Sequence, residues 1–151
     1  MPTTTDDAVV REIHIEATAE TIFEFFVDPD KLTRWLAVEA ELDPRPGGVC
    51  RQVHEGEPPR RGVFHMRGEF LEVDPPKRVV FSWGFEEPDV GVAPGASTVE
   101  VTLSPNAAGT GTRVLLVHRG LPSAAVADHG AGWVIMLNRL ADAVRAPGVR
   151  P

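Results

Sequence analysis

The chain has 151 residues and a net charge of −7 at pH 7, and its hydrophobic fraction of 42% and charged fraction of 25% are typical of a globular domain. The excess of acidic residues argues against nucleic acid as a partner, because neutralising phosphates needs clustered lysine and arginine. A single cysteine, Cys50, excludes an intrachain disulfide, and the absence of tyrosine leaves proton transfer to histidines, carboxylates, hydroxyl side chains or water.

The length suits one domain, which we place at residues 9–146, between a flexible leader at 1–8 and a flexible tail at 147–151. The first residues lack the charged and apolar regions of a signal peptide. No stretch approaches the roughly 18–20 apolar residues that are needed to span a bilayer. We therefore expect a cytoplasmic protein that does not insert into a membrane.

The N-terminal part of the chain predicts one strand followed by two short helices. Near-perfect alternation of apolar residues indicates a strand over 9–17. Thr18 is placed to cap a helix whose apolar stripe reaches Val27. Asp28 then caps a second helix, with Pro29 at its first position. The apolar face of this second helix consists of Leu32, Trp35 and Leu36.

The remainder predicts six strands and a long helix. Apolar residues alternate in segments that are separated by turns rich in proline and glycine. Gly68, inside the longest segment, marks a bulge or a close approach of the backbone. Helical periodicity with one apolar face runs over 123–146. The predicted strands are 38–42, 49–54, 62–73, 78–85, 98–103 and 112–118.

This order of elements predicts an α+β fold. Short connections between consecutive strands imply an antiparallel sheet. A long helix with one apolar face must cover such a sheet. We expect a curved antiparallel sheet of about seven strands wrapped on the long C-terminal helix, with two short helices after the first strand and room for a cavity between helix and sheet.

Seven segments, taken in order and spacing, resemble the START-like (SRPBCC) superfamily, which shares its helix-grip fold with polyketide cyclases and Bet v-type allergens. The chain is most similar to the branch related to the C-terminal domain of the heat-shock-protein-90 ATPase activator, over roughly residues 9–145. The segments are Ile15–Ala17, Asp28–Trp35, Asp43–Gly48, Gly68–Pro76, Val79–Trp83, Thr112–Leu121 and His129–Trp133. The resemblance implies the helix-grip fold, a deep pocket under the long helix and often a homodimer. It implies no single reaction, since members bind lipids, hormones or polyketides or serve as co-chaperones.

Aromatic residues are the first candidates for a pocket wall, because aromatic side chains line most small-molecule sites. Trp35, Trp83 and Trp133 belong to three elements that this fold is expected to bring around one volume. Plain core packing is the alternative for each of them. The predicted ligand-binding residues are Trp35, Phe64, Met66, Phe81, Trp83, Phe85, His118, Trp133 and Met136.

His118 is the candidate polar group of the pocket, because it alternates with Val114 and Leu116 and so points toward the helix side of the sheet. It could orient a ligand or act as a general base. The alternative is a structural histidine that is hydrogen-bonded to the last helix. His54 and His65 are interpreted as strand-surface residues. The histidines lack the spacing of a metal site, so we expect no metal and no cofactor.

Three hypotheses about function follow. The favoured one is non-catalytic binding of a small hydrophobic or amphipathic ligand in an internal cavity. The enzyme alternative is a cyclase, dehydratase or hydrolase acting on a similar ligand, with His118 as the base. The third is a co-chaperone-like interaction protein with a chaperone as its partner. A homodimer is expected in each case.

Overall fold

The computed structural model describes residues 8–56, 62–107 and 109–145, so the predicted tail and, apart from Ala8, the predicted leader lie outside the described residues. The elements match the predicted order: one strand, two helices, six strands and a long helix. They are β1 (Val9–Ile15), α1 (Ala19–Val27), α2 (Pro29–Leu32), β2 (Glu39–Leu42), β3 (Val49–Glu55), β4 (Val63–Asp74), β5 (Arg78–Trp83), the 3₁₀ helix η2 (Pro88–Val90), β6 (Ser97–Pro105), β7 (Thr112–Arg119) and α3 (Ser123–Arg145).

Side-chain caps start the two short helices. Thr18 Oγ1 accepts a hydrogen bond from the Thr21 backbone N–H at 3.2 Å, and Asp28 Oδ1 accepts one from the Asp30 N–H at 2.8 Å. The second helix ends at Leu32, earlier than its apolar pattern suggested, and the chain continues in turns. Those turns carry Trp35, whose indole Nε1–H donates to the Phe25 carbonyl oxygen at 2.9 Å. Trp35 is thereby held against α1.

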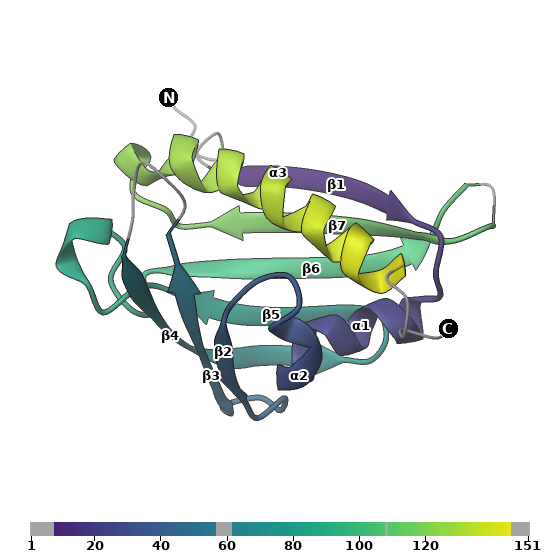
Figure 1. Cartoon of the computed structure of the whole chain (residues 1–151), viewed down its shortest axis with the longest axis horizontal. Helices are drawn as coiled ribbons and strands as arrows, with labels where there is room; N and C mark the ends of the chain where they lie inside the picture. Colours follow the sequence, from purple (N-terminus) through teal and green to yellow (C-terminus); the bar gives the residue numbers. More distant parts are fainter. Residues whose placement is uncertain (1–7, 57–61, 108, 146–151) are drawn as a thin grey trace.

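The described strands form one antiparallel sheet in the order β1-β7-β6-β5-β4-β3-β2. Figure 1 shows β3 and β4 running steeply across the view while β1, β6 and β7 lie nearly level, so the sheet twists strongly from one edge to the other. Strand β4 has a register shift between Phe70 and Glu72. A Cβ on Gly68 would lie 2.0 Å from the Ser82 carbonyl oxygen, so only glycine fits there. Gly68 is thus a position of close backbone approach, one of the two predicted alternatives, whereas the register shift of the strand lies further along, between Phe70 and Glu72.

The long helix α3 lies across the sheet and packs its apolar side on it (Figure 1). Trp133, Leu137, Leu140 and Val144 are buried on this side of the helix. The sheet contributes the inward residues of β6 and β7, where buried and half-buried positions alternate strictly. The helix-grip fold is therefore confirmed. No helix in the described ranges is both long enough and apolar enough to cross a membrane.

Candidate functional site

An open cleft of about 470 Å³ lies between the N-terminal half of α3 and the sheet, where β3 ends and β4 begins. This volume falls within the range of about 300–1,000 Å³ that is usual for small-molecule sites. Apolar and aromatic side chains make up most of its wall. They are Leu36, Phe64, Trp83, Phe85, Val90, Ala131, Trp133, Ile135 and Met136, together with the polar residues His54, Glu55, Asp128 and His129.

Trp83, at the end of β5, is the centre of the cluster under the cleft. Its ring centroid lies 5.3 Å from that of Trp133, and 5.5 Å from those of Phe85, His54 and His118. These contacts join three strands to α3, and the edge-to-face packing of Trp83 with Phe85, His54 and His118 is favourable. The floor of the cleft is therefore a packed aromatic layer rather than a set of mobile side chains.

His118 is fully buried and both of its ring nitrogens have partners. Trp133 Nε1–H donates to His118 Nδ1 at 3.0 Å. Since an indole nitrogen only donates, Nδ1 carries the lone pair and Nε2 carries the hydrogen. Nε2–H then donates to Ser97 Oγ at 2.9 Å, and the Ser97 hydroxyl donates to the Trp83 carbonyl oxygen at 2.9 Å. The chain of hydrogen bonds is complete with a neutral imidazole.

Burial favours this neutral form. Desolvation, assisted by the nearby ring of His129, lowers the pKa of His118 to about 3. A base must offer a lone pair to the proton it removes. The only lone pair of His118 is already used by Trp133. The geometry therefore supports a structural role for His118, which braces α3 through Trp133, and argues against a role as a base.

His129, on the first half of α3, is arranged in the opposite way. Trp83 Nε1–H donates to its Nε2 at 3.3 Å, so Nδ1 carries the hydrogen and donates to the Ala125 carbonyl oxygen at 3.0 Å. The centroids of the His129 and His118 rings are 5.4 Å apart. The indole N–H groups of Trp83 and Trp133, beneath the cleft, thus both donate hydrogen bonds to histidines.

A row of polar side chains follows the inward face of β3. His54 Nε2 and Gln52 Oε1 are 2.9 Å apart, and Gln52 Nε2 lies 3.8 Å from Cys50 Sγ. Desolvation lowers the pKa of His54 to about 4 and raises the pKa of the Cys50 thiol to about 12. At neutral pH this row is therefore uncharged and its thiol is unreactive.

Five of the nine predicted ligand-binding residues line the cleft: Phe64, Trp83, Phe85, Trp133 and Met136. The other four lie elsewhere. Trp35 packs on Phe26, with ring centroids 5.1 Å apart, and Phe81 is in the core. His118 lies beneath the floor, and Met66 lines a different hollow. Trp35 therefore does not share the volume that Trp83 and Trp133 enclose.

Sequence reasoning missed two histidines of the cleft, His54 and His129. His54 was interpreted as a surface residue, yet its strand neighbours on the same face, Gln52 and Cys50, are buried. The available signal was the alternation of inward and outward side chains along this strand. It was missed because two inward positions, 52 and 54, carry polar residues. His65 is exposed as expected, and the Glu87 carboxylate, 2.6 Å away, raises its pKa.

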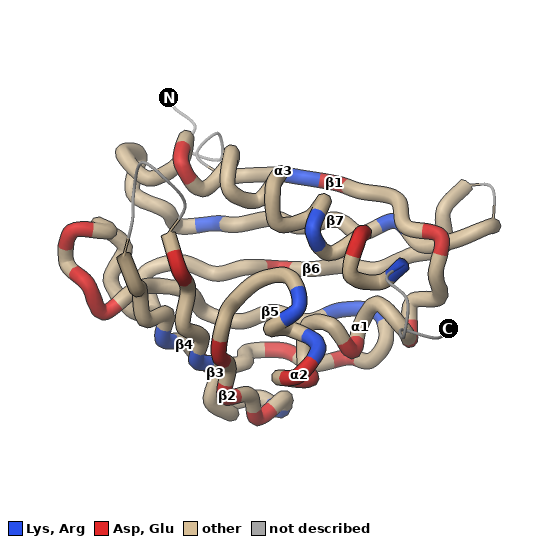
Figure 2. Tube along the Cα trace, viewed as in Figure 1, with Lys and Arg blue, Asp and Glu red and all other residues tan. Residues whose placement is uncertain are grey.

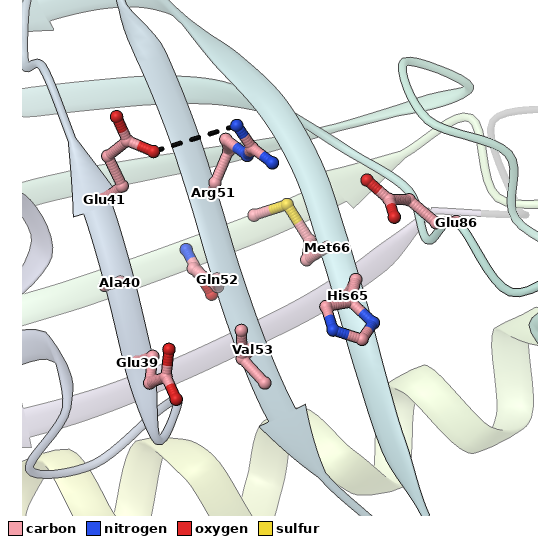
Figure 3. A pocket seen from close by; sticks show the side chains of 9 residues that line it. All are labelled: Glu39, Ala40, Glu41, Arg51, Gln52, Val53, His65, Met66 and Glu86. Carbon is pink, nitrogen blue, oxygen red and sulfur yellow. Dashed lines mark ion pairs between the residues drawn. The ribbon is translucent and has the colours of Figure 1, made fainter.

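The second hollow, about 260 Å³, lies on the outer face of β2, β3 and β4 (Figure 3). Two of the glutamates that line it form ion pairs with arginines. Arg51 lies 3.8 Å from Glu41, the pair joined by the dashed line in Figure 3. Arg67 lies 3.6 Å from Glu86. In the described part of the chain, no group of three or more histidine, cysteine, aspartate or glutamate side chains is arranged to hold a metal ion.

Comparison with known proteins agrees with this architecture. DynU16, a protein in the dynemicin biosynthetic locus, is 25% identical with a TM-score of 0.74; the match covers 93% of this chain, which spans only 48% of that one. The AHSA1-like protein from Aeromonas hydrophila is 24% identical with a TM-score of 0.74, covering 95% of each chain. The Aha1 dimer from Colwellia psychrerythraea is 17% identical with a TM-score of 0.71, covering 93% of this chain and 98% of that one. No curated protein matches the chain.

The family model described as activator of Hsp90 ATPase homolog 1-like protein matches residues 16–145. This match runs from the end of β1 to the end of α3 and includes every element that lines the cleft. The chain therefore belongs to the activator of Hsp90 ATPase homolog 1-like family.

Proposed function

We propose that the protein binds a small, neutral, apolar or amphipathic molecule in the cleft between α3 and the ends of β3, β4 and β5. The observation that carries the proposal is the aromatic wall of an open cleft of about 470 Å³. Ile135 stands at this cleft with 47% of its surface exposed. Covering such apolar surface with a ligand gains about 25 cal/mol per Å², which gives the cleft a driving force for binding.

The charges of the protein argue against an anionic ligand. Figure 2 shows lysine and arginine scattered over several strands and helices rather than gathered on one face. Neither residue type occurs among the described residues that line the cleft. An anionic headgroup would therefore find no described cation there to offset the loss of its hydration.

Binding is favoured over catalysis by the state of the two histidines beneath the cleft. His118 and His129 each accept a hydrogen bond from a tryptophan and donate one to an oxygen. Neither has a lone pair left for a substrate proton. The cyclase, dehydratase or hydrolase alternative would need another base.

The test is isothermal titration with naphthalene and the methyl ether of naphthol as neutral apolar probes. Gly132→Leu places a side chain in the cleft, where a Cβ would meet no heavy atom within 4 Å. Val134→Leu, on the exposed side of the same helix, is the matched control. We expect the wild type and the control to bind, and Gly132→Leu to bind at least about tenfold more weakly. Absence of binding to the wild type, or equal binding by all three proteins, refutes the proposal.

A second candidate is an interaction with a chaperone, which the description of the matched family supports. A purified Hsp90 whose ATPase activity rises on addition of this chain would favour this function.

We further propose a homodimer, supported by the likeness of the fold to the Aha1 dimer of Colwellia psychrerythraea. The two edge strands of the sheet, β1 and β2, are candidates for the contact.

A further inference from the structure

One hydrogen-bonding atom in the wall of the cleft, His54 Nδ1, has no hydrogen-bond partner among the described residues. Within residues 8–56, 62–107 and 109–145, the only hydrogen bond of the His54 ring is the one from Nε2 to Gln52 Oε1, at 2.9 Å. No buried side-chain nitrogen or oxygen in the described ranges lacks a partner. His54 Nδ1 is therefore accessible, and the His54 ring lines the cleft.

The neighbouring side chains determine what this atom offers. Gln52 directs its amide nitrogen toward Cys50 Sγ, so its oxygen faces His54. A carbonyl oxygen only accepts, so His54 Nε2 carries the hydrogen and Nδ1 carries the lone pair. Burial keeps the imidazole neutral at pH 7 by lowering its pKa. His54 thus presents an acceptor to the cleft.

The other ring nitrogens beneath the cleft offer nothing comparable. The N–H groups of Trp83 and Trp133 are taken by His129 and His118. The ring of His54 packs edge-to-face with both Trp83 and Phe85, at centroid distances of 5.5 Å and 5.6 Å. The acceptor is therefore fixed in position beside an aromatic wall, an arrangement that can orient a ligand.

We infer that the cleft selects neutral aromatic or alicyclic ligands that carry a hydroxyl or N–H group, which donates a hydrogen bond to His54 Nδ1. This inference rests on the proposed ligand-binding function. A phenol or an alcohol fits, because its apolar body covers Trp83 and Phe85 while its hydrogen reaches the lone pair. An ether or a hydrocarbon of the same shape covers the acceptor without satisfying it, which is unfavourable.

The test compares naphthol with its methyl ether by isothermal titration at pH 7. We expect the wild type to bind naphthol about fivefold more tightly than the ether, the scale of one net hydrogen bond. His54→Phe keeps an aromatic ring but removes the acceptor, so the preference should disappear. His14→Phe, which changes an exposed histidine on β1, is the matched control and should keep it.

The outcomes separate the two proposals. Equal binding of naphthol and its ether by the wild type overturns the inference while leaving the cleft as a binding site. Binding of neither compound refutes both. If His54→Phe does not fold, histidine nitrogen NMR on the wild type decides instead: the His54 Nδ1 signal should move on addition of naphthol and stay in place with the ether. A signal that moves equally with both overturns the inference.

Discussion

Mild acid is expected to destabilise the fold through His118. In the unfolded chain this histidine titrates near its ordinary pKa of 6.5, whereas desolvation lowers the folded pKa to about 3. The unfolded state therefore binds a proton as the pH falls below 6.5, and the native state does so only near 3. Stability is thus complete above pH 6.5 and is lost progressively between 6.5 and about 3. Linkage gives a loss of about 2 kcal/mol between pH 7 and pH 5.

His118→Gln isolates this contribution. A glutamine amide oxygen can accept from Trp133 Nε1–H and its NH₂ group can donate to Ser97 Oγ, which replaces both bonds of the imidazole without a titrating group. His54, whose pKa is lowered, and His65, whose pKa is raised, act alike in both proteins and cancel in the comparison.

The assay is urea unfolding of both proteins at pH 7, 6 and 5, with the free energy of unfolding taken from linear extrapolation. The wild type should lose about 2 kcal/mol more than His118→Gln over this range. If the free energies of unfolding of the two proteins changed in parallel with pH, His118 would bind a proton equally in the folded and unfolded states. That result would refute the neutral hydrogen-bond chain through Trp133 and Ser97.

Two further outcomes are expected. Gly132→Ala should stabilise the protein by about 0.5–1 kcal/mol in urea unfolding, because alanine favours the helix and its Cβ would meet no heavy atom within 4 Å. Gly68→Ala, the contrasting variant, should be strongly destabilising, since its Cβ would lie 2.0 Å from a carbonyl oxygen. Equal effects of the two substitutions on the free energy of unfolding would contradict this prediction. Light scattering at high micromolar concentration should give a particle of twice the 16.4 kDa chain mass; a particle of 16.4 kDa would refute the homodimer.

Local sequence was sufficient to predict the elements. Thr18 and Asp28 cap their helices as expected, because a cap acts over two or three residues and needs no distant partner. The alternation in β6 and β7 identified the buried face of each strand, since successive side chains must point to opposite sides. The predicted end of the second helix was too late, because an apolar pattern does not distinguish a helix from consecutive turns.

The partners of the polar groups were decided only by the tertiary structure. Whether His118 could be a base depended on Trp133, on a different element, which takes its lone pair. Which nitrogen of His54 keeps a free lone pair depended on Gln52, whose amide oxygen faces His54 because its amide nitrogen faces Cys50. Trp35 shared the aromatic character of Trp83 and Trp133 but packs against α1 instead. A residue type fixes what a side chain can donate or accept, whereas the packing of distant segments determines which of those capacities is already used and which remains for a ligand.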